Sequence, residues 1–337
     1  MDSTQFPTLK ELEIVKCPTL SSLPPVPWTN SPCRALIEEV RSDFQHLKYS
    51  TNNQSELCLL VKGKDDNLDS AFWRLLVFSN LTELKELTLT KCPPLPLEHL
   101  QSLSSLRMLC MQDLSNVLLQ DKAENTVRYQ FPVEQLRIFN CSCSGKELTL
   151  LSSHFPKLSM FVIRGCENIR GLGVAKQGMT AMSASSLPSA GSKLEDECLG
   201  QEQQEPGEED EKAAADGGLL LLPQQLQYLT IGEMSELALV FDTAGGLRGV
   251  GEGLQGLHSI KNLNIWNCPN FLSSYSSSSH HSPFPSSLQE LFLSYMSGMN
   301  TLSPLSNLNS LAKLAIWDFG DLRAEGLGSL IAHGQLN

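Results

Sequence analysis

The ten residues "LKELEIVKCP", from Leu9 to Pro18, contain the pattern that decides the fold. Apolar side chains stand at Leu9, Leu12, Ile14 and Cys17, at intervals of three, two and three residues, and most of the residues between them are charged. A helix would repeat its apolar positions about every three to four residues, and a half-buried strand about every second residue. Neither period runs through all four positions, so the stretch fits a short strand with a bend on each side.

The same pattern recurs along the chain. Close copies are LKELTLTKCP (84–93), VEQLRIFNC (133–141), LSMFVIRGC (158–166) and IKNLNIWNCP (260–269), and looser copies begin at residues 106, 226, 288 and 311. The copies that begin at 84, 106, 133 and 158 are 22, 27 and 25 residues apart, and those at 260, 288 and 311 are 28 and 23 apart. Leucine-rich repeats have this signature and a period of about 20 to 29 residues.

The repeat predicts how the chain packs. In each copy the middle pair, such as Leu12 and Ile14, fits a short strand whose two side chains point to one face, because strand side chains alternate. One such coil cannot bury its apolar face alone, whereas stacked coils place their strands in a parallel sheet over one core. We therefore expect an α/β fold: a leucine-rich-repeat solenoid (horseshoe) with a concave parallel β-sheet and an irregular, partly helical convex face.

Two regions interrupt the repeat. The first divides the chain into repeats over 1–170, an acidic insertion over 171–218 and further repeats over 219–337. Between Lys193 and Asp216 there are ten acidic and two basic residues. Like charges with few apolar residues predict a disordered loop, either a tolerated insertion or an acidic docking segment.

The second interruption, at about 24–81, is ambiguous. SELCLLVKG (55–63) alternates like a strand, and LDSAFWRLLVFSNL (68–81) has the pattern of an amphipathic helix, so we expect two or three irregular coils there. Helical turns are also expected in LEHLQSL (97–103) and in GKELTLLSSHF (145–155), the latter capped by Gly145.

The chain has ten cysteines, and five hold the same repeat position: Cys17, Cys92, Cys141, Cys166 and Cys268. Stacking would bury them, and Cys suits such a position because it is small and apolar. The sequence has no C-x-x-C pair, whereas zinc sites need clustered ligands at characteristic spacing. We therefore expect structural thiols in a reducing, cytoplasmic compartment, since the first residues do not have the pattern of a secretory signal.

Composition and motifs argue against several functional classes. A net charge of −12 opposes a nucleic-acid-binding module, which usually carries a basic patch, and no apolar run reaches the ~18 residues of a membrane helix. The chain lacks the phosphate-loop and nucleophile-elbow motifs, and the G-x-G-x-x-G at 251–256 lies in a glycine-rich stretch with no preceding strand. We expect a non-catalytic protein with no cofactor or metal, and with no nucleic-acid or membrane partner.

The remaining functional candidates lie on the strand positions between the inward leucines. Aromatic residues gather there in the later copies, and large apolar side chains on an outward face are typical of binding surfaces. We expect a protein ligand to contact the concave face at Tyr228, Trp266, Phe292, Trp317, Phe139, Arg137 and Arg164. For Trp266 and Trp317 the alternative is that they fold back over the strand edge and seal the solenoid.

The strands of the form LxLxxCP, the stretch "LSSLP" (20–24) and the runs ELKELTLTKCPPLPLEHLQSLSSL (83–106) and YQFPVEQLRI (129–138) resemble the carboxy-terminal repeats of plant nucleotide-binding leucine-rich-repeat disease resistance proteins. The resemblance is to the coiled-coil class common in cereals and covers nearly the whole chain. It implies an intracellular immune receptor whose repeats recognise a pathogen effector or a guarded host protein and contact the receptor's own nucleotide-binding domain. This chain has neither the coiled coil nor the nucleotide-binding domain, so we expect a fragment or a truncated gene product.

Two other classes remain open. A substrate adaptor of a ubiquitin ligase also uses intracellular leucine-rich repeats, but it would carry an amino-terminal F-box, whereas Met1 leads directly into a repeat. An enzyme is the weaker alternative, because no catalytic constellation is evident. An upstream reading frame would separate the first two classes, since the receptor requires a nucleotide-binding domain and the adaptor an F-box.

Overall fold

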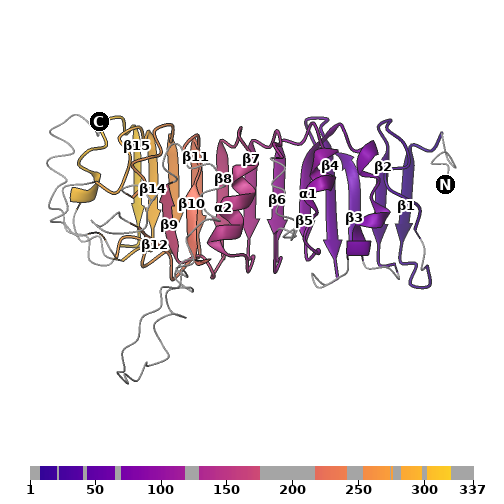
Figure 1. Ribbon diagram of the computed structural model, residues 1–337, viewed down its shortest axis with the longest axis horizontal. Helices are drawn as coiled ribbons and strands as arrows, with labels where there is room; N and C mark the ends of the chain where they lie inside the picture. The colour runs from indigo at the N-terminus through magenta and orange to yellow at the C-terminus, as the bar shows by residue number, and fades with distance from the viewer. Residues whose placement is uncertain are drawn as a thin grey trace, which may run out of the picture.

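The computed structural model describes residues 8–20, 23–40, 44–64, 70–117, 129–174, 217–240, 253–273, 275, 282–297 and 302–319. Over these residues the chain forms a long, mostly parallel sheet with few helices (Figure 1). The molecule is elongated in the direction in which the strands follow one another. The predicted parallel sheet is therefore confirmed.

Twelve strands make up this sheet over the described ranges, and they follow the order of the chain. They are β1 (Glu11–Val15), β2 (Arg34–Glu38), β3 (Phe44–Thr51), β4 (Leu57–Gly63), β5 (Leu84–Thr90), β6 (Met108–Gln112), β7 (Gln135–Phe139), β8 (Met160–Arg164), β11 (Tyr228–Gly232), β13 (Asn262–Trp266), β14 (Glu290–Ser294) and β15 (Lys313–Trp317). Neighbouring strands are parallel, except that β3 is antiparallel to both β2 and β4.

A second, smaller layer accompanies the sheet. It contains a three-stranded parallel sheet in the order β10 (Leu219–Leu222), β9 (Gly171–Val174), β12 (Ala238–Leu239). Short helices complete the layer: α1 (Leu97–Gln101), α2 (Gly145–Ser153) and the 3₁₀ helices η1 (Ser70–Leu75), η2 (Phe78–Asn80) and η4 (Ser303–Leu305). The hydroxyl of Thr149 on α2 accepts a hydrogen bond from the Leu221 amide of β10, at 2.9 Å.

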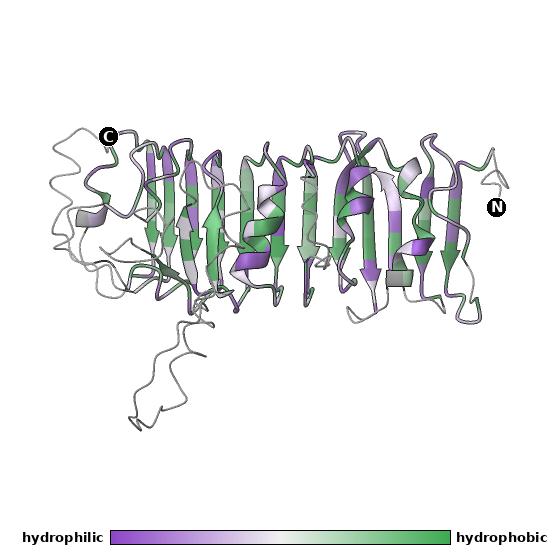
Figure 2. Ribbon diagram, viewed as in Figure 1, coloured by the Kyte–Doolittle hydropathy of each residue, from purple (hydrophilic) through white to green (hydrophobic). Residues whose placement is uncertain are grey.

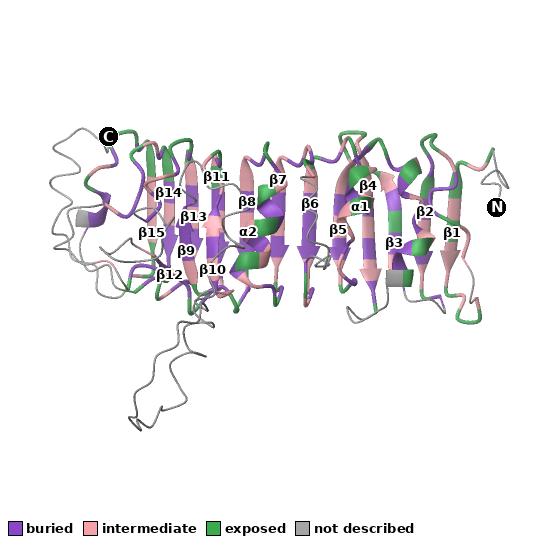
Figure 3. Ribbon diagram, viewed as in Figure 1, coloured by how far each residue is buried: buried purple, intermediate pink, exposed green. Residues whose placement is uncertain are grey.

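The register of the sheet follows the repeated leucines. Leu87 lies opposite Leu109, Leu109 opposite Leu136, and Leu229 opposite Leu263. Apolar and polar residues alternate along the strands (Figure 2), and buried residues recur on neighbouring strands (Figure 3). Leu87, Leu136 and Leu263 are at most 2% exposed, so the leucine pattern defines the core.

The two end strands differ from this prediction. We expected Leu12 and Leu314 to be buried like Leu87, yet both are only partly buried. They lie on β1 and β15, the strands at the two ends of the sheet, and each of these strands has one described neighbour (Figure 3). A core residue on an end strand therefore lacks the packing that a second flanking strand provides.

The ambiguous region at 24–81 contains β2, β3 and β4. The expected strand at 55–63 is present, but the antiparallel β3 was not predicted. A short turn joins β3 to β4, in which Asn52 Oδ1 accepts hydrogen bonds from the amides of Gln54 and Glu56, at 2.8 and 2.9 Å. Adjacent strands joined by so short a connection are antiparallel, because a parallel pair needs a long crossover.

The predicted amphipathic helix at 68–81 is replaced by the 3₁₀ helices η1 and η2. Its aromatic residues are nevertheless buried, as expected for a core-facing segment: Phe72, Trp73 and Phe78 are each at most 7% exposed. Trp73 packs edge-on against Phe72, with ring centroids 4.8 Å apart. The apolar pattern therefore predicted which residues are buried but not the type of helix.

The helical turns expected at 97–103 and 145–155 correspond to α1 and α2. The N-cap of α2 is Ser144 rather than the predicted Gly145. The Ser144 hydroxyl accepts a hydrogen bond from the Glu147 amide at 3.2 Å, and the Glu147 carboxylate accepts one from the Ser144 amide at 2.8 Å. This capping box satisfies two backbone donors at the start of the helix.

The acidic insertion begins later than predicted. Gly171–Val174, which we assigned to the disordered insertion, form β9 and pair with β10 in parallel register. The acidic stretch itself, 193–216, lies outside the described residues. Regular structure therefore extends through β9 and is present again from β10 onward, and these two strands pair with each other.

The residue after each repeat strand has a positive φ, between +49° and +64°. These residues are Lys16, Glu39, Lys91, Asp113, Asn140, Gly165, Glu233, Asn267, Tyr295 and Asp318. In most of them the amide donates to the last carbonyl of the next strand in the sheet, as in Asn140 to Arg164 at 2.8 Å and Glu233 to Trp266 at 3.1 Å. The strand ladder thus continues one residue into the turn.

The repeated cysteines follow this turn residue. Of the five, Cys92, Cys141, Cys166 and Cys268 are buried and Cys17 is partly buried. Each thiol donates to the carbonyl two residues before it, as in Cys92 to Thr90 at 3.2 Å and Cys268 to Trp266 at 3.4 Å. Cys therefore fills a small apolar position and adds a weak donor to the turn.

Replacement of a core leucine tests the register. Leu263→Asp places a charge without a partner in a packed core, so we expect the free energy of unfolding to fall by about 3 kcal/mol or more. Thr90→Asp, on the opposite face of β5, is the matched control and should change it by less than about 1 kcal/mol. Urea unfolding would measure both, and equal effects would contradict the assignment of faces.

The buried thiols predict a loss of stability at high pH. Burial raises the pKa of Cys92 and Cys141 to about 12 and that of Cys268 to about 11, from 9.0. Above pH 9 the unfolded chain ionises these thiols while the folded chain keeps them protonated, so the free energy of unfolding falls as pH rises from 9 toward 11. Urea unfolding between pH 8 and 11 should show a shallower pH dependence for Cys268→Ala than for the unchanged chain. An identical dependence would contradict this assignment for Cys268.

Candidate functional site

The candidate site lies on the outer face of the main sheet, which we define as the face that carries the residues between the inward leucines. Each strand contributes three such residues, and the strand register arranges them in three rows across β8, β11, β13, β14 and β15. The first row is Met160, Tyr228, Asn262, Glu290 and Lys313. The second row is Val162, Thr230, Asn264, Phe292 and Ala315. The third row is Arg164, Gly232, Trp266, Ser294 and Trp317.

The first and second rows line a hollow of about 350 Å³, which we call the outer hollow. It is lined by Met160, Val162, Tyr228, Thr230, Asn262, Asn264, Glu290, Phe292, Lys313 and Ala315, together with the inward residues Leu229, Leu263 and Leu291 of the strands beneath it. This volume is at the small end of the range for ligand pockets, about 300 to 1,000 Å³. The hollow extends across five strands, so it is a strip on the sheet rather than a deep pocket.

The outer hollow has a polar side along the first row. Asn262 Nδ2 donates to Glu290 Oε2 at 2.8 Å. Lys313 lies opposite Glu290 on the next strand, but within the described part of the chain it forms no ion pair. Asn264 Oδ1 is buried and has no hydrogen-bond partner among the described residues. The hollow therefore combines a satisfied carboxylate, an ammonium without a salt bridge and an unsatisfied carbonyl oxygen.

Two of the predicted anchors line the outer hollow. Tyr228 is 39% exposed, and Phe292 is partly exposed in the second row, between Asn264 and Ala315. Trp317 is 61% exposed and packs edge-on against Phe292, with ring centroids 5.3 Å apart. The four aromatic residues occupy all three rows, and Trp266 and Trp317 lie outside the lining of the hollow.

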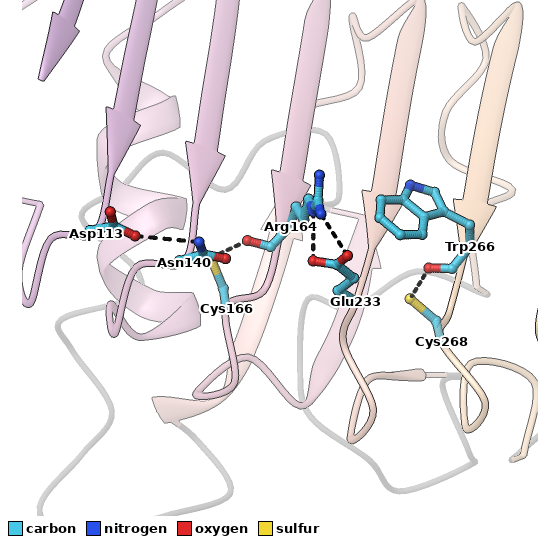
Figure 4. Close-up of polar contacts among 7 residues, drawn as sticks. All are labelled: Asp113, Asn140, Arg164, Cys166, Glu233, Trp266 and Cys268. Atoms are coloured by element: carbon cyan, nitrogen blue, oxygen red, sulfur yellow. Dashed lines mark hydrogen bonds and ion pairs between the residues drawn. The ribbon is translucent and has the colours of Figure 1, made fainter. Parts of the chain in front are cut away.

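Trp266 belongs to a separate cluster, shown in Figure 4. The guanidinium of Arg164 lies 4.8 Å from the centroid of the Trp266 ring. Gly232, which lies between them in the third row, has no side chain, and a Cβ there would collide with the indole. Trp266 therefore extends over β11 to reach Arg164, which agrees with the alternative that this ring seals the sheet.

Arg164 also forms an ion pair. Its Nε and Nη2 donate to the two carboxylate oxygens of Glu233, both at 2.6 Å (Figure 4). These hydrogen bonds to Glu233 raise the pKa of the guanidinium. The two residues are 69 positions apart in the chain, so the pair joins the strand before the acidic insertion to the turn after it.

Arg137 and Phe139 lie one strand further along, on β7. Arg137 Nη2 donates to Gln135 Oε1 at 3.4 Å, whereas its buried Nε has no partner among the described residues. Burial raises the pKa of the neighbouring Cys110 thiol, and the charge of Arg137 partly offsets that rise. Neither Arg137 nor Phe139 lines the outer hollow.

The sequence prediction omitted Asn262, Asn264, Glu290 and Lys313. All four occupy outward positions of the repeat, so the pattern placed them on the correct face. Their side chains are polar rather than aromatic, and they come together only through the strand register. Alignment of the repeat copies would have predicted this grouping, because it places Glu290 between Asn262 and Lys313 in one row.

The comparisons with known proteins do not assign the chain to a family: no protein-family model matches it, and no curated protein matches it. Among the described residues, no helix is long and apolar enough to cross a membrane.

Gly232→Ala tests the Trp266 cluster. The new Cβ would displace the indole from β11 and disturb its contact with Arg164, so we expect a loss of about 1 to 3 kcal/mol in unfolding free energy and a shift of tryptophan emission to longer wavelength. Gly217→Ala is the matched control, because a Cβ at Gly217 meets nothing within 4 Å. Thermal unfolding of both variants would measure the loss of stability, and their fluorescence spectra would measure the shift in tryptophan emission. A Gly232→Ala protein that matches the control in both would show that Trp266 is not held over β11.

Proposed function

We propose that the chain is a leucine-rich-repeat solenoid that recognises a protein ligand through the outer face of its sheet, without catalysis. The observation that carries the proposal is the outer hollow, where an exposed tyrosine, a partly exposed phenylalanine and several polar side chains meet on β8 to β15. Interface hot spots combine aromatic anchors with polar groups in this way.

The repeated backbone geometry supports the solenoid part of the proposal. Strand, positive-φ turn and cysteine recur in the same order, and strands before and after the acidic insertion share one register. Solenoids tolerate such insertions, because each coil packs mainly against its neighbours. The proposal therefore accounts for both the regular sheet and the interrupted sequence.

The sequence resemblance supplies the biological context of the proposal. In an immune receptor of the plant nucleotide-binding class, the repeats would act in the cytoplasm, bind a pathogen effector or a guarded host protein and contact the receptor's own nucleotide-binding domain. A ubiquitin-ligase adaptor with an F-box is the alternative, and it would use the same face for its substrate. The two functions differ in the module joined to the repeats rather than in the repeats themselves.

The gene and its transcript test the context. An open reading frame that joins a nucleotide-binding domain to residue 1 would support the receptor, and one that joins an F-box would support the adaptor. The transcript must be sequenced from its capped end, so that a truncated product is distinguished from an incomplete sequence. A transcript that joins neither module to the repeats would contradict both functions.

The anchors of the outer hollow test the binding face. For a partner that binds the purified chain, Tyr228→Ala and Phe292→Ala should each weaken binding by about 2 kcal/mol, since truncation of a central aromatic anchor typically costs this much. Thr88→Ala, a second-row residue of β5 outside the hollow, is the control and should leave the affinity unchanged. Calorimetric titration and melting temperatures would be measured for each variant. Normal binding by both aromatic variants would place the interface elsewhere.

A further inference from the structure

We infer that the outer hollow binds an extended peptide segment that carries a carboxylate at its β15 end. The inference rests on the proposed function, because it specifies the ligand of the same face. Three features carry it: the shape of the hollow, the ammonium of Lys313, which has no ion pair within the described ranges, and the apolar surface beside that ammonium.

The shape of the hollow favours an extended chain. Strands in a sheet are about 4.8 Å apart, so the five strands from β8 to β15 span roughly 19 Å. An extended polypeptide advances about 3.3 Å per residue, and about six residues would cover this length. A compact small molecule would fill only part of such a strip.

The charges give the segment a direction. The Glu290 carboxylate, opposite Lys313 on β14, accepts a hydrogen bond from Asn262 and would repel an acidic group that lay over β14. Lys313 is exposed and has no ion pair within the described ranges. An ammonium of this kind pairs readily with a carboxylate. We therefore place the acidic group of the peptide at Lys313.

The second row supplies the remaining contacts. Phe292 and Ala315 form an apolar surface next to Lys313, which suits an apolar side chain two or three residues before the acidic one. Asn264 lies two strands from Lys313, which is roughly 10 Å across the sheet and about three residues of extended chain. Its buried Oδ1 has no hydrogen-bond partner among the described residues, and we expect it to accept a hydrogen bond from a backbone N–H of the segment after rotation of the Asn264 side chain.

A carbohydrate ligand is less well matched to this face. Carbohydrate rings stack on the flat faces of exposed aromatic side chains, but the Trp266 ring is already in contact with Arg164. Trp317 lies outside the lining of the hollow and packs against Phe292. Within the hollow the groups available to a ligand are better suited to peptide amides and a carboxylate.

Two pools of fluorescein-labelled hexapeptides test the inference. Both have the form X-Leu-X-Leu-X-Z, where X is a mixture of Gly, Ser and Thr and Z is Asp in one pool and Lys in the other. Anisotropy titration of the full chain should show about threefold or more tighter binding of the Asp pool, because an exposed ion pair contributes up to about fivefold in affinity and the Lys pool replaces this attraction by repulsion. Equal binding of the two pools, or no binding of either, would overturn the inference.

Charge reversal at the proposed contact makes the test specific. Lys313→Glu should abolish or invert the preference for the Asp pool, whereas Lys62→Glu, on β4 outside the hollow, should preserve it. Asn264→Leu should weaken binding of the Asp pool about tenfold, with its melting temperature measured to show that it folds. A preference for the Asp pool that survives Lys313→Glu would overturn the inference.

The outcome is distinguishable from failure of the proposed function. A protein partner that loses affinity with Tyr228→Ala and Phe292→Ala, in a chain that binds neither peptide pool, would show that the face recognises a folded surface. The peptide inference would then fall while the proposed function stands.

Discussion

The fold depends on one backbone constraint, the left-handed residue that follows each repeat strand. At Lys91, Asp113, Asn140 and Glu233 the φ angle lies near +50°, a conformation that costs an L-residue roughly 1 to 2 kcal/mol. The turn persists because its amide donates to the next strand at about the distance of a sheet hydrogen bond. Each turn is therefore stabilised by the neighbouring strand, and a strand without such a neighbour would lose this compensating hydrogen bond.

This coupling explains how one register is kept across the acidic insertion. The amide of Gly165, after β8, donates to the carbonyl of Gly232 on β11, at 3.1 Å. The Arg164–Glu233 ion pair crosses the same junction, although an exposed pair of this kind contributes little by itself. Backbone pairing and the Trp266 contact thus join strands that are far apart in sequence. An insertion between them adds only the slowly growing entropy of closing a longer loop.

The sequence predicted the features that depend on side-chain periodicity. The leucine spacing placed Leu87, Leu136 and Leu263 in the core and assigned the outward residues of each repeat strand correctly. It did not predict the antiparallel β3, because that depends on the Asn52 turn, nor the 3₁₀ form of η1 and η2, because buried aromatic residues suit several helical geometries. Asp113, Asn140 and Gly165 are residue types that tolerate positive φ, but Lys91 and Glu233 are not, so no single residue type marks the turn.

The candidate site was predicted less completely than the fold, since it depends on contacts between rows rather than on which face a residue occupies. Trp266 and Phe292 are both aromatic, outward and close in sequence, and nothing in the repeat pattern separates them. The separation comes from the residues beside each ring: Gly232 leaves space for the Trp266 ring to cross β11, whereas Phe292 lies between Asn264 and Ala315 in the second row. A ring that can lie over a glycine becomes part of the sheet surface, whereas Phe292, whose row neighbours both carry a side chain, stays on its own strand and lines the outer hollow. The size of the residue opposite each aromatic side chain, together with the strand register, therefore separates the ring that packs on the sheet from the ring that lines the candidate site.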